Sequence, residues 1–415
     1  MLDINKIREQ KKLIEKALLK RMAASDLDLE TVINIDNRRR QLLQEAEVLK
    51  AERNKYSKVK PDQETIKKMK KLGEKIKESD EQVKSVEKEL RERLSELPNI
   101  PADDVLAGGK ENNKIVKVFK GKPDFKFKPK DHVELAVSLD IIDYERAAKM
   151  SGSGFWCYKG RGAQLEWALL NYFIHFHNKN KYTFILPPYL LNEDSAYASG
   201  HLPKFKADLF WTQDNTCLNA TSEMMLTNYH RGEILNEDDL PLKYYAYSAC
   251  FRREAGSYRK EERGMIRGHQ FNKIEMFHFA KPDQSWEGFK ELIANAEKLV
   301  EGLGLHYQTV QLAAGDCSAA MAKTMDIEVW IPSMQNYKEV SSISNALDYQ
   351  ARRAGIRFKD SKTAKNEFVH TLNASGLATS RLFPAILEQF QQADGSVEVP
   401  KVLQKYCGFK KIERK

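Results

Sequence analysis

The sequence lacks several features that would place it in a common class. Its five cysteines lie far apart and form no Cys-x-x-Cys pair, so neither a disulfide framework nor a zinc site is indicated. No apolar run approaches the roughly 20 residues of a membrane-spanning helix. The charged start, MLDINKIREQKKLIEKALLK, has no apolar core of the kind found in secretory signals. We therefore expect a cytoplasmic protein that does not contact a membrane and needs no zinc.

Two common enzyme motifs are also missing. The sequence contains no Gly-x-x-x-x-Gly-Lys-Ser/Thr loop and no His-Glu-x-x-His pair. What it does have is length and charge: 415 residues favour two domains, and a net charge of +9 suggests a polyanionic partner.

Residues 28–97 differ from the rest in being dense in lysine and glutamate and almost free of aromatics. Apolar side chains recur every seven residues, at 35, 42, 49 and 56, and after Pro61 at 69, 76, 83, 90 and 97. This pattern predicts an antiparallel coiled-coil hairpin about 45 Å long. Eleven basic residues face four acidic ones between Lys50 and Lys77, around the predicted tip. A solvated helical face and a lever that contacts nucleic-acid phosphates both fit this charge, and the arm alone does not decide between them.

Beyond the arm, prolines and a Gly-Gly pair in 101–124 indicate a linker, and residues 125–415 have a globular composition. Helical periodicity marks 163–178 and 383–391. Strand patterns mark 181–190, 243–254, 266–279, 326–333 and 337–345. Strands dominate the centre without regular alternation with helices. This order predicts an α+β fold, an antiparallel sheet flanked by helices.

The stretch FRREAGSYRKEERGMIRGHQFNKIEMF, residues 251–277, places many charges between two apolar strand-like segments. Strand alternation would put Arg267, Phe271 and Glu275 on one face, and Arg252 and Glu254 on one face of the preceding strand. Arginines suit phosphate oxygens, an aromatic ring can stack on a base, and a carboxylate can hold an amine. A salt-bridge ladder on an exposed sheet fits equally well, so this hairpin alone leaves both interpretations open.

Two further segments add polar groups. Thr221, Ser222 and Glu223 follow a predicted strand, and residues 373–376, Asn-Ala-Ser-Gly, are predicted to form a turn before a helix whose first turn holds Arg381. Each segment alone is more typical of a turn and a helix cap. Together they supply the hydroxyls, amine acceptors and arginines that a small zwitterion and ATP would require.

The chain resembles the seryl-tRNA synthetases, which are class II aminoacyl-tRNA synthetases, over nearly its whole length. Residues 1–100 with the arm and its exit LPNIPADDV resemble the family's tRNA-binding domain, and 125–415 its catalytic domain. The family's motifs 1, 2 and 3 correspond to 163–191, 244–279 and 370–391. The resemblance implies a homodimeric enzyme that uses ATP and Mg²⁺ to join L-serine to tRNA(Ser), and to tRNA(Sec) where the cell has one.

The resemblance also implies roles for individual residues. For ATP, Arg252 would contact the α-phosphate, Arg267 the outer phosphates and Arg381 the γ-phosphate, while Glu254 lies beside adenine and Phe271 stacks on it. Glu339 and Ser342 would hold magnesium and phosphate. Thr221, Glu223 and Glu275 would bind the serine amino group, and Asn373 and Ser375 its hydroxyl. Four neighbours complete the predicted sets: Arg253, Val340 and Ser341 for ATP, and Ser222 for serine.

Some segments depart from the family pattern. The departures from the residues usual in the family are the motif 2 loop GSYRKEERG, Ile343 in SSISN, Ala374 in NASG and His201 in HLPKF. The loop meets the acceptor end of tRNA in this family. An alternative is therefore a paralogue that binds tRNA but has lost amino-acid activation.

Overall fold

The computed structural model describes residues 1–56, 62–255 and 264–414. The chain divides into two compact units, Met1–Ile100 and Pro101–Lys415, each with its own internal packing. Across the described ranges, no helix is both long and apolar enough to cross a membrane.

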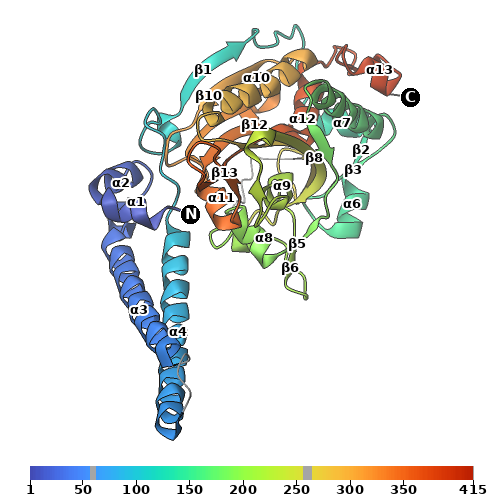
Figure 1. Cartoon of the computed structure of the whole chain (residues 1–415). Coiled ribbons are helices and arrows are strands. Elements are labelled where there is room, and N and C mark those ends of the chain that lie inside the picture. The colour runs from blue at the N-terminus through green and yellow to red at the C-terminus, as the bar shows by residue number, and fades with distance from the viewer. Residues whose placement is uncertain (57–61, 256–263, 415) are drawn as a thin grey trace. The chain divides into compact units, whose positions relative to one another are not determined.

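The first unit contains the predicted helical hairpin. Helices α3 (Leu29–Tyr56) and α4 (Gln63–Glu96) pack along each other, and α1 (Ile4–Glu9) and α2 (Lys11–Leu18) precede them (Figure 1). Ile35, Ile76, Val83 and Leu90 of the heptad pattern are buried. The ion pair between Lys50 and Asp80, at 2.8 Å, joins the two helices in antiparallel register. The residues between them at 57–61, where the sequence predicts the tip, lie outside the described residues.

The second unit is built on a sheet that has eight strands within the described residues, in the order β1-β10-β11-β12-β15-β9-β8-β4. Its strands are β1 (Lys114–Phe119), β10 (Tyr307–Gln311), β11 (Lys323–Ile331), β12 (Asn336–Leu347), β15 (His370–Ala378), β9 (Gln270–Ala280), β8 (Leu242–Phe251) and β4 (Thr183–Ile185). Neighbouring strands are antiparallel except β4 and β8. The prediction of an antiparallel α+β sheet flanked by helices is confirmed.

Helices cover the two faces of this sheet unequally. On one face lie α7 (Arg161–Lys179), α10 (Ser285–Leu303) and α12 (Thr379–Gln389), whose apolar residues join the largest core. On the other lie α8 (Glu193–Ala198), α9 (Ser222–Asn228) and α11 (Tyr349–Ala354), around a smaller core (Figure 1). This second face is the one that carries the pocket described below.

Smaller elements surround the sheet: α5 (His132–Ser138), α6 (Tyr144–Ser151), α13 (Gln404–Cys407), and the short strands β2 (Ile142–Asp143), β3 (Cys157–Tyr158), β5 (Leu190–Asn192), β6 (Thr216–Leu218), β7 (Ile234–Leu235), β13 (Arg357–Lys359), β14 (Asn366–Phe368), β16 (Val397–Glu398) and β17 (Lys411–Ile412).

Three local expectations need correction. The segment 101–124, predicted as a linker, contributes β1 to the edge of the sheet and belongs to the second unit. Residues 373–376, predicted as a turn, lie within β15, because this strand pairs with β12 on one side and β9 on the other. The two strands of the charged hairpin are shorter than predicted: β8 ends at Phe251 and β9 begins at Gln270, so Arg252, Glu254 and Arg267 lie beyond the strand ends.

Candidate active site

A cavity of about 440 Å³ lies on the less covered face of the sheet. The cavity is lined by strands β9, β12 and β15, the segment 252–255 after β8, the start of α9, and the segments 199–209 and 318–321. A smaller hollow of about 50 Å³ shares Arg252, Glu254, Arg267 and Glu339 with the cavity and adds Phe271 and Arg381. Residues from motifs 2 and 3 and from the Thr221–Glu223 segment therefore line neighbouring parts of one region.

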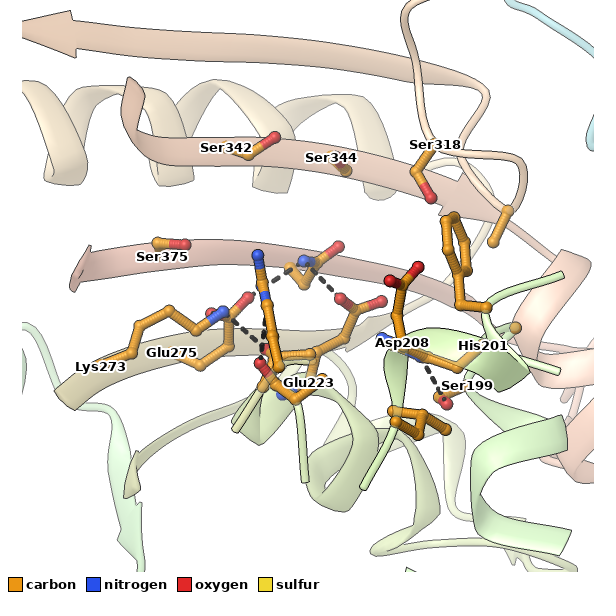
Figure 2. A pocket seen from close by; sticks show the side chains of 18 of the residues that line it. Ser199, His201, Asp208, Glu223, Lys273, Glu275, Ser318, Ser342, Ser344 and Ser375 are labelled. Carbon is orange, nitrogen blue, oxygen red and sulfur yellow. Dashed lines mark hydrogen bonds and ion pairs between the residues drawn. The ribbon is translucent and has the colours of Figure 1, made fainter. Parts of the chain in front are cut away.

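One end of the cavity, here called the carboxylate end, consists of Thr221, Glu223, Lys273, Glu275 and Asn373, all buried. Asn373 Nδ2 donates to Glu275 Oε1 at 3.0 Å and to Glu223 Oε2 at 3.2 Å. Lys273 Nζ donates to Thr221 Oγ1 at 2.6 Å and forms an ion pair with Glu275 Oε2 at 2.5 Å. Figure 2 shows these acidic and basic side chains together, with Ser342, Ser344 and Ser375 on the neighbouring strands β12 and β15. Hydrogen bonds therefore hold this end in place without a ligand.

Glu223 carries the clearest electrostatic signal at this end. Burial, and then the negative charge of Glu275, raise its pKa to about 7, although Lys273 and a hydrogen bond from Gln350 act against the shift. Gln350 Nε2 donates to Glu223 Oε1 at 2.7 Å. Two buried carboxylates lie beside only one ammonium group. A second, positively charged group from a ligand would be favoured here, because it would relieve the repulsion between the carboxylates.

The other end, here called the arginine end, consists of Arg252, Glu254, Arg267, Glu339 and Arg381. Arg267 forms an ion pair with Glu254, where the chain turns with a positive φ of 52° after β8. Arg381 Nη1 donates to the backbone oxygen of Glu339 at 2.8 Å and lies 3.6 Å from its carboxylate. The side chains of these two pairs are 21–43% exposed. They can therefore rearrange around an incoming anion.

An aromatic ring accompanies this end. The guanidinium of Arg252 lies over the ring of Phe271, 5.2 Å from its centroid, and Arg252 Nε donates to the backbone oxygen of Ala220 at 3.2 Å. A planar base can stack on such a ring while the guanidinium contacts its phosphate.

Oxygen ligands for a divalent cation also meet here. Glu339 and Ser342 both line the cavity, although they are three residues apart on one strand. The pairing of β12 with β11 shifts between Ser341 and Glu339, and this bulge at Val340 lets the two side chains face the same side. Buried Asp326 lies opposite Ser342, and its Oδ1 has no hydrogen-bond partner among the described residues. Burial and the charge of Glu339 raise its pKa well above the usual range.

Four of the predicted site residues line neither the cavity nor the smaller hollow. Val340 packs into the main core, and buried Ser341 donates from Oγ to the backbone oxygen of Ser375 at 2.5 Å. Ser222 is buried at the start of α9, where its hydroxyl meets that of Ser248 at 2.7 Å. Arg253 is exposed, and its backbone N–H donates to Asp208. The motif 2 loop, 256–263, lies outside the described residues.

Other functional candidates were missed from the sequence. Lys273 has the same strand parity as Phe271 and Glu275, so the alternation that identified those two would also have identified it. His201 and Asp208 also line the cavity. His201 was noted only as a departure within HLPKF, and no local pattern marks Asp208, which ends the short 3-10 helix Lys206–Asp208. Ser199 meets Nδ1 of His201 at 3.0 Å, and burial lowers the pKa of His201, which leaves it neutral.

No three histidine, cysteine, aspartate or glutamate side chains meet as metal ligands within residues 1–56, 62–255 and 264–414. A cation at Glu339 and Ser342 would therefore need ligand atoms from the substrate as well.

The antiparallel sheet and the arginine-rich cavity define a class of protein. Residues 205–390 match the family model of the tRNA synthetase class II core domain (G, H, P, S and T), so the second unit has a class II synthetase core. Residues 1–101 match the model of the seryl-tRNA synthetase N-terminal domain.

Relatives and solved structures identify one family within this class. The chain is 54% identical over 427 residues to serine–tRNA ligase 2 of Clostridium acetobutylicum, with 99% of this chain and 100% of the relative covered. The crystal structure of seryl-tRNA synthetase from Pyrococcus horikoshii complexed with ATP matches with a TM-score of 0.92 and 35% identity, covering both chains completely. Cytoplasmic serine–tRNA ligase from Naegleria fowleri in complex with AMP matches with a TM-score of 0.87 and 32% identity, covering 100% of this chain and 99% of that one. The chain belongs to the seryl-tRNA synthetase family.

Proposed function

We propose that this chain is a serine–tRNA ligase that activates L-serine with ATP and transfers the seryl group to tRNA(Ser). The observation that carries the proposal is one continuous site that joins buried carboxylates, suited to an ammonium group, to arginines, suited to phosphates. Similarity to serine–tRNA ligases over the full length supports serine as the amino acid. Neighbouring structures named as ATP and AMP complexes support a nucleotide at the arginine end.

ATP would bind at the arginine end. Arg252 would contact the α-phosphate, Arg267 and Arg381 the outer phosphates, and Glu254 the adenine side of the nucleotide, with the base on Phe271. Arg267 already pairs with Glu254, and Arg381 with Glu339, so ATP has to compete with these carboxylates. Val340 and Ser341 would act through the backbone of β12, because their side chains are turned away from the cavity.

Serine would bind at the carboxylate end. Its ammonium group would pair with Glu223 and Glu275 and donate a hydrogen bond to the hydroxyl of Thr221, while Asn373 and Ser375 would fix its hydroxyl. Lys273 occupies the position beside Thr221 and Glu275, so its ammonium group would move toward the serine carboxylate and the α-phosphate when serine enters. Ser222 would support the start of α9 through Ser248.

Mg²⁺ fits the donor set of this site. Glu339 and Ser342 offer the oxygen ligands that Mg²⁺ prefers, and the unsatisfied Oδ1 of Asp326 lies on the adjacent strand. Substrate phosphates usually complete such a coordination sphere. The bound ion would neutralise charge on the phosphates.

The reaction follows from these placements. A serine carboxylate oxygen attacks the α-phosphorus of ATP, the bond to the bridging oxygen breaks, and pyrophosphate leaves with that electron pair. A terminal hydroxyl of tRNA then attacks the carbonyl of seryl-adenylate, and AMP leaves. No side chain need act as a nucleophile, because positioning and charge neutralisation supply the catalysis.

The same proposal includes the wider setting of the enzyme: a cytoplasmic homodimer that also serylates tRNA(Sec) where the cell has one. The basic tip of the helical arm supports a nucleic-acid partner, since eleven basic residues between 50 and 77 can contact phosphates.

The test is serine-dependent exchange of pyrophosphate into ATP by the purified protein without tRNA, with threonine, alanine and cysteine as controls. Strong exchange with serine alone is the expected result. Binding of ATP and tRNA without exchange would overturn the proposal and support the paralogue that has lost activation.

A further inference from the structure

Glu166 is a buried carboxylate that the proposed reaction does not use. It lies on α7 and is 3% exposed. Its Oε1 accepts hydrogen bonds from Asn272 Nδ2 at 2.7 Å and from Thr379 Oγ1 at 2.5 Å. Its Oε2 has no hydrogen-bond partner in the part of the chain that the structure describes. One oxygen of a motif 1 side chain therefore connects motifs 2 and 3.

Both partners of Glu166 lie next to proposed ATP-binding residues. Asn272 stands between Phe271 and Lys273 on β9, and strand alternation directs its side chain to the face away from the cavity. Thr379 is the first residue of α12, two before Arg381, and its hydroxyl also meets the backbone oxygen of Asn272 at 3.2 Å. The carboxylate thus holds the strand that carries Phe271 against the helix start that carries Arg381.

We propose that Glu166 is a positioning residue for amino-acid activation, which sets the distance between the adenine platform, Phe271, and the γ-phosphate arginine, Arg381. The inference rests on the proposed function, because those two roles belong to it. A shift of about 1 Å between such groups can cost roughly 100-fold in rate.

A residue that only fills the core would not need a polar group here. The neighbours Leu165 and Leu169 on α7 are fully buried, and a leucine at 166 could pack without the desolvation that a carboxylate suffers. Burial raises the pKa of Glu166 to about 7. The hydroxyls of Tyr158 on β3 and Tyr247 on β8 lie near this carboxylate, and burial raises the pKa of both, so both stay neutral and neither adds a second negative charge. What the carboxyl group adds is an acceptor shared by Asn272 and Thr379.

The experiment measures serine-dependent ATP–pyrophosphate exchange in the full-length protein while ATP is varied. Glu166→Leu removes the acceptor and keeps apolar volume, and we expect the KM for ATP to rise about 10- to 100-fold, with a smaller change in the KM for serine. Glu166→Gln keeps one acceptor oxygen and is expected to stay within about threefold of the wild type. The matched control is Glu388→Gln, another buried carboxylate of the same unit, on α12, whose partners His132 and Ser333 lie away from the cavity.

A second variant keeps the test informative if Glu166→Leu does not fold. Thr379→Val keeps the side-chain shape without the hydroxyl and should raise the KM for ATP several-fold. Where Glu166→Leu folds, the effects of the two substitutions on the KM for ATP should not add if the two groups act as one unit. An unchanged KM for ATP in Glu166→Leu or Thr379→Val, or an equal rise in Glu388→Gln, would overturn the inference. Failure of the wild type to exchange would instead overturn the proposed function.

Discussion

The two ends of the cavity hold their charged groups in different ways. At the carboxylate end Glu275 is fully buried, and Lys273, Asn373 and Gln350 fix the two glutamates through short hydrogen bonds and an ion pair. At the arginine end the side chains are partly exposed and pair with carboxylates that a nucleotide can replace. A buried polar site rejects ligands that leave its polar groups unsatisfied, whereas a partly exposed set of arginines can close around a phosphate chain. We therefore expect the carboxylate end to determine selectivity and the arginine end to determine reactivity.

The largest effect is expected at the arginine end. Arg252→Ala should lower the kcat of serine-dependent exchange about 100- to 1,000-fold, because it removes charge that stabilises the transition state at the α-phosphate. Since the guanidinium makes one backbone contact and one ring contact, the melting temperature should change little. Kinetics with a parallel thermal melt check this, and a loss below tenfold would contradict the role of Arg252.

The next effect is expected at the carboxylate end. Glu275→Gln should lower kcat/KM for serine about 100-fold, because it removes an ammonium acceptor and leaves Lys273 without its buried counter-charge. The KM for ATP should stay within about threefold. An equal loss of kcat/KM for serine and for ATP would show that the two ends do not bind their substrates independently.

A smaller effect should appear as a pH dependence. Because the pKa of Glu223 is about 7, its carboxylate is largely protonated at pH 6 and ionised at pH 8. The KM for serine should therefore fall about tenfold over this range. Exchange kinetics at several pH values measure it, and Glu223→Gln is the control that should remove the step. A flat profile in the wild type would contradict the assignment.

The raised pKa of Glu223 also makes the stability of the folded protein depend on pH. The folded protein keeps a proton on Glu223 between pH 4.5 and about 7, where the unfolded chain has released it, so this group lowers stability as the pH rises through that window.

The smallest effect is expected outside the cavity. Arg253→Ala should leave the KM for ATP within about twofold, because the side chain is exposed and does not line the cavity. Exchange kinetics with varied ATP test this against Arg267→Ala, which removes a side chain that does line it. A tenfold rise in Arg253→Ala would restore Arg253 to the ATP-binding set.

Particular elements explain what the sequence could and could not predict. Heptads at positions such as Ile76 and Val83 predicted the hairpin because burial follows the repeat directly. Residues 373–376 lack strand-like composition, and their place in β15 comes from pairing with strands far away in the sequence. The bulge at Val340 is also invisible in the sequence, yet it decides that Glu339 and Ser342 face the cavity while Ser341 does not.

The roles of the two ends can be tested together with a stable analogue of seryl-adenylate, in which a sulfamoyl group replaces the phosphate. Titration calorimetry on the full-length protein should give tight binding of the seryl analogue and binding at least about 100-fold weaker for the alanyl analogue, which lacks the hydroxyl that Asn373 and Ser375 are proposed to fix. Equal affinity for the two analogues, or no binding of either, would contradict the account.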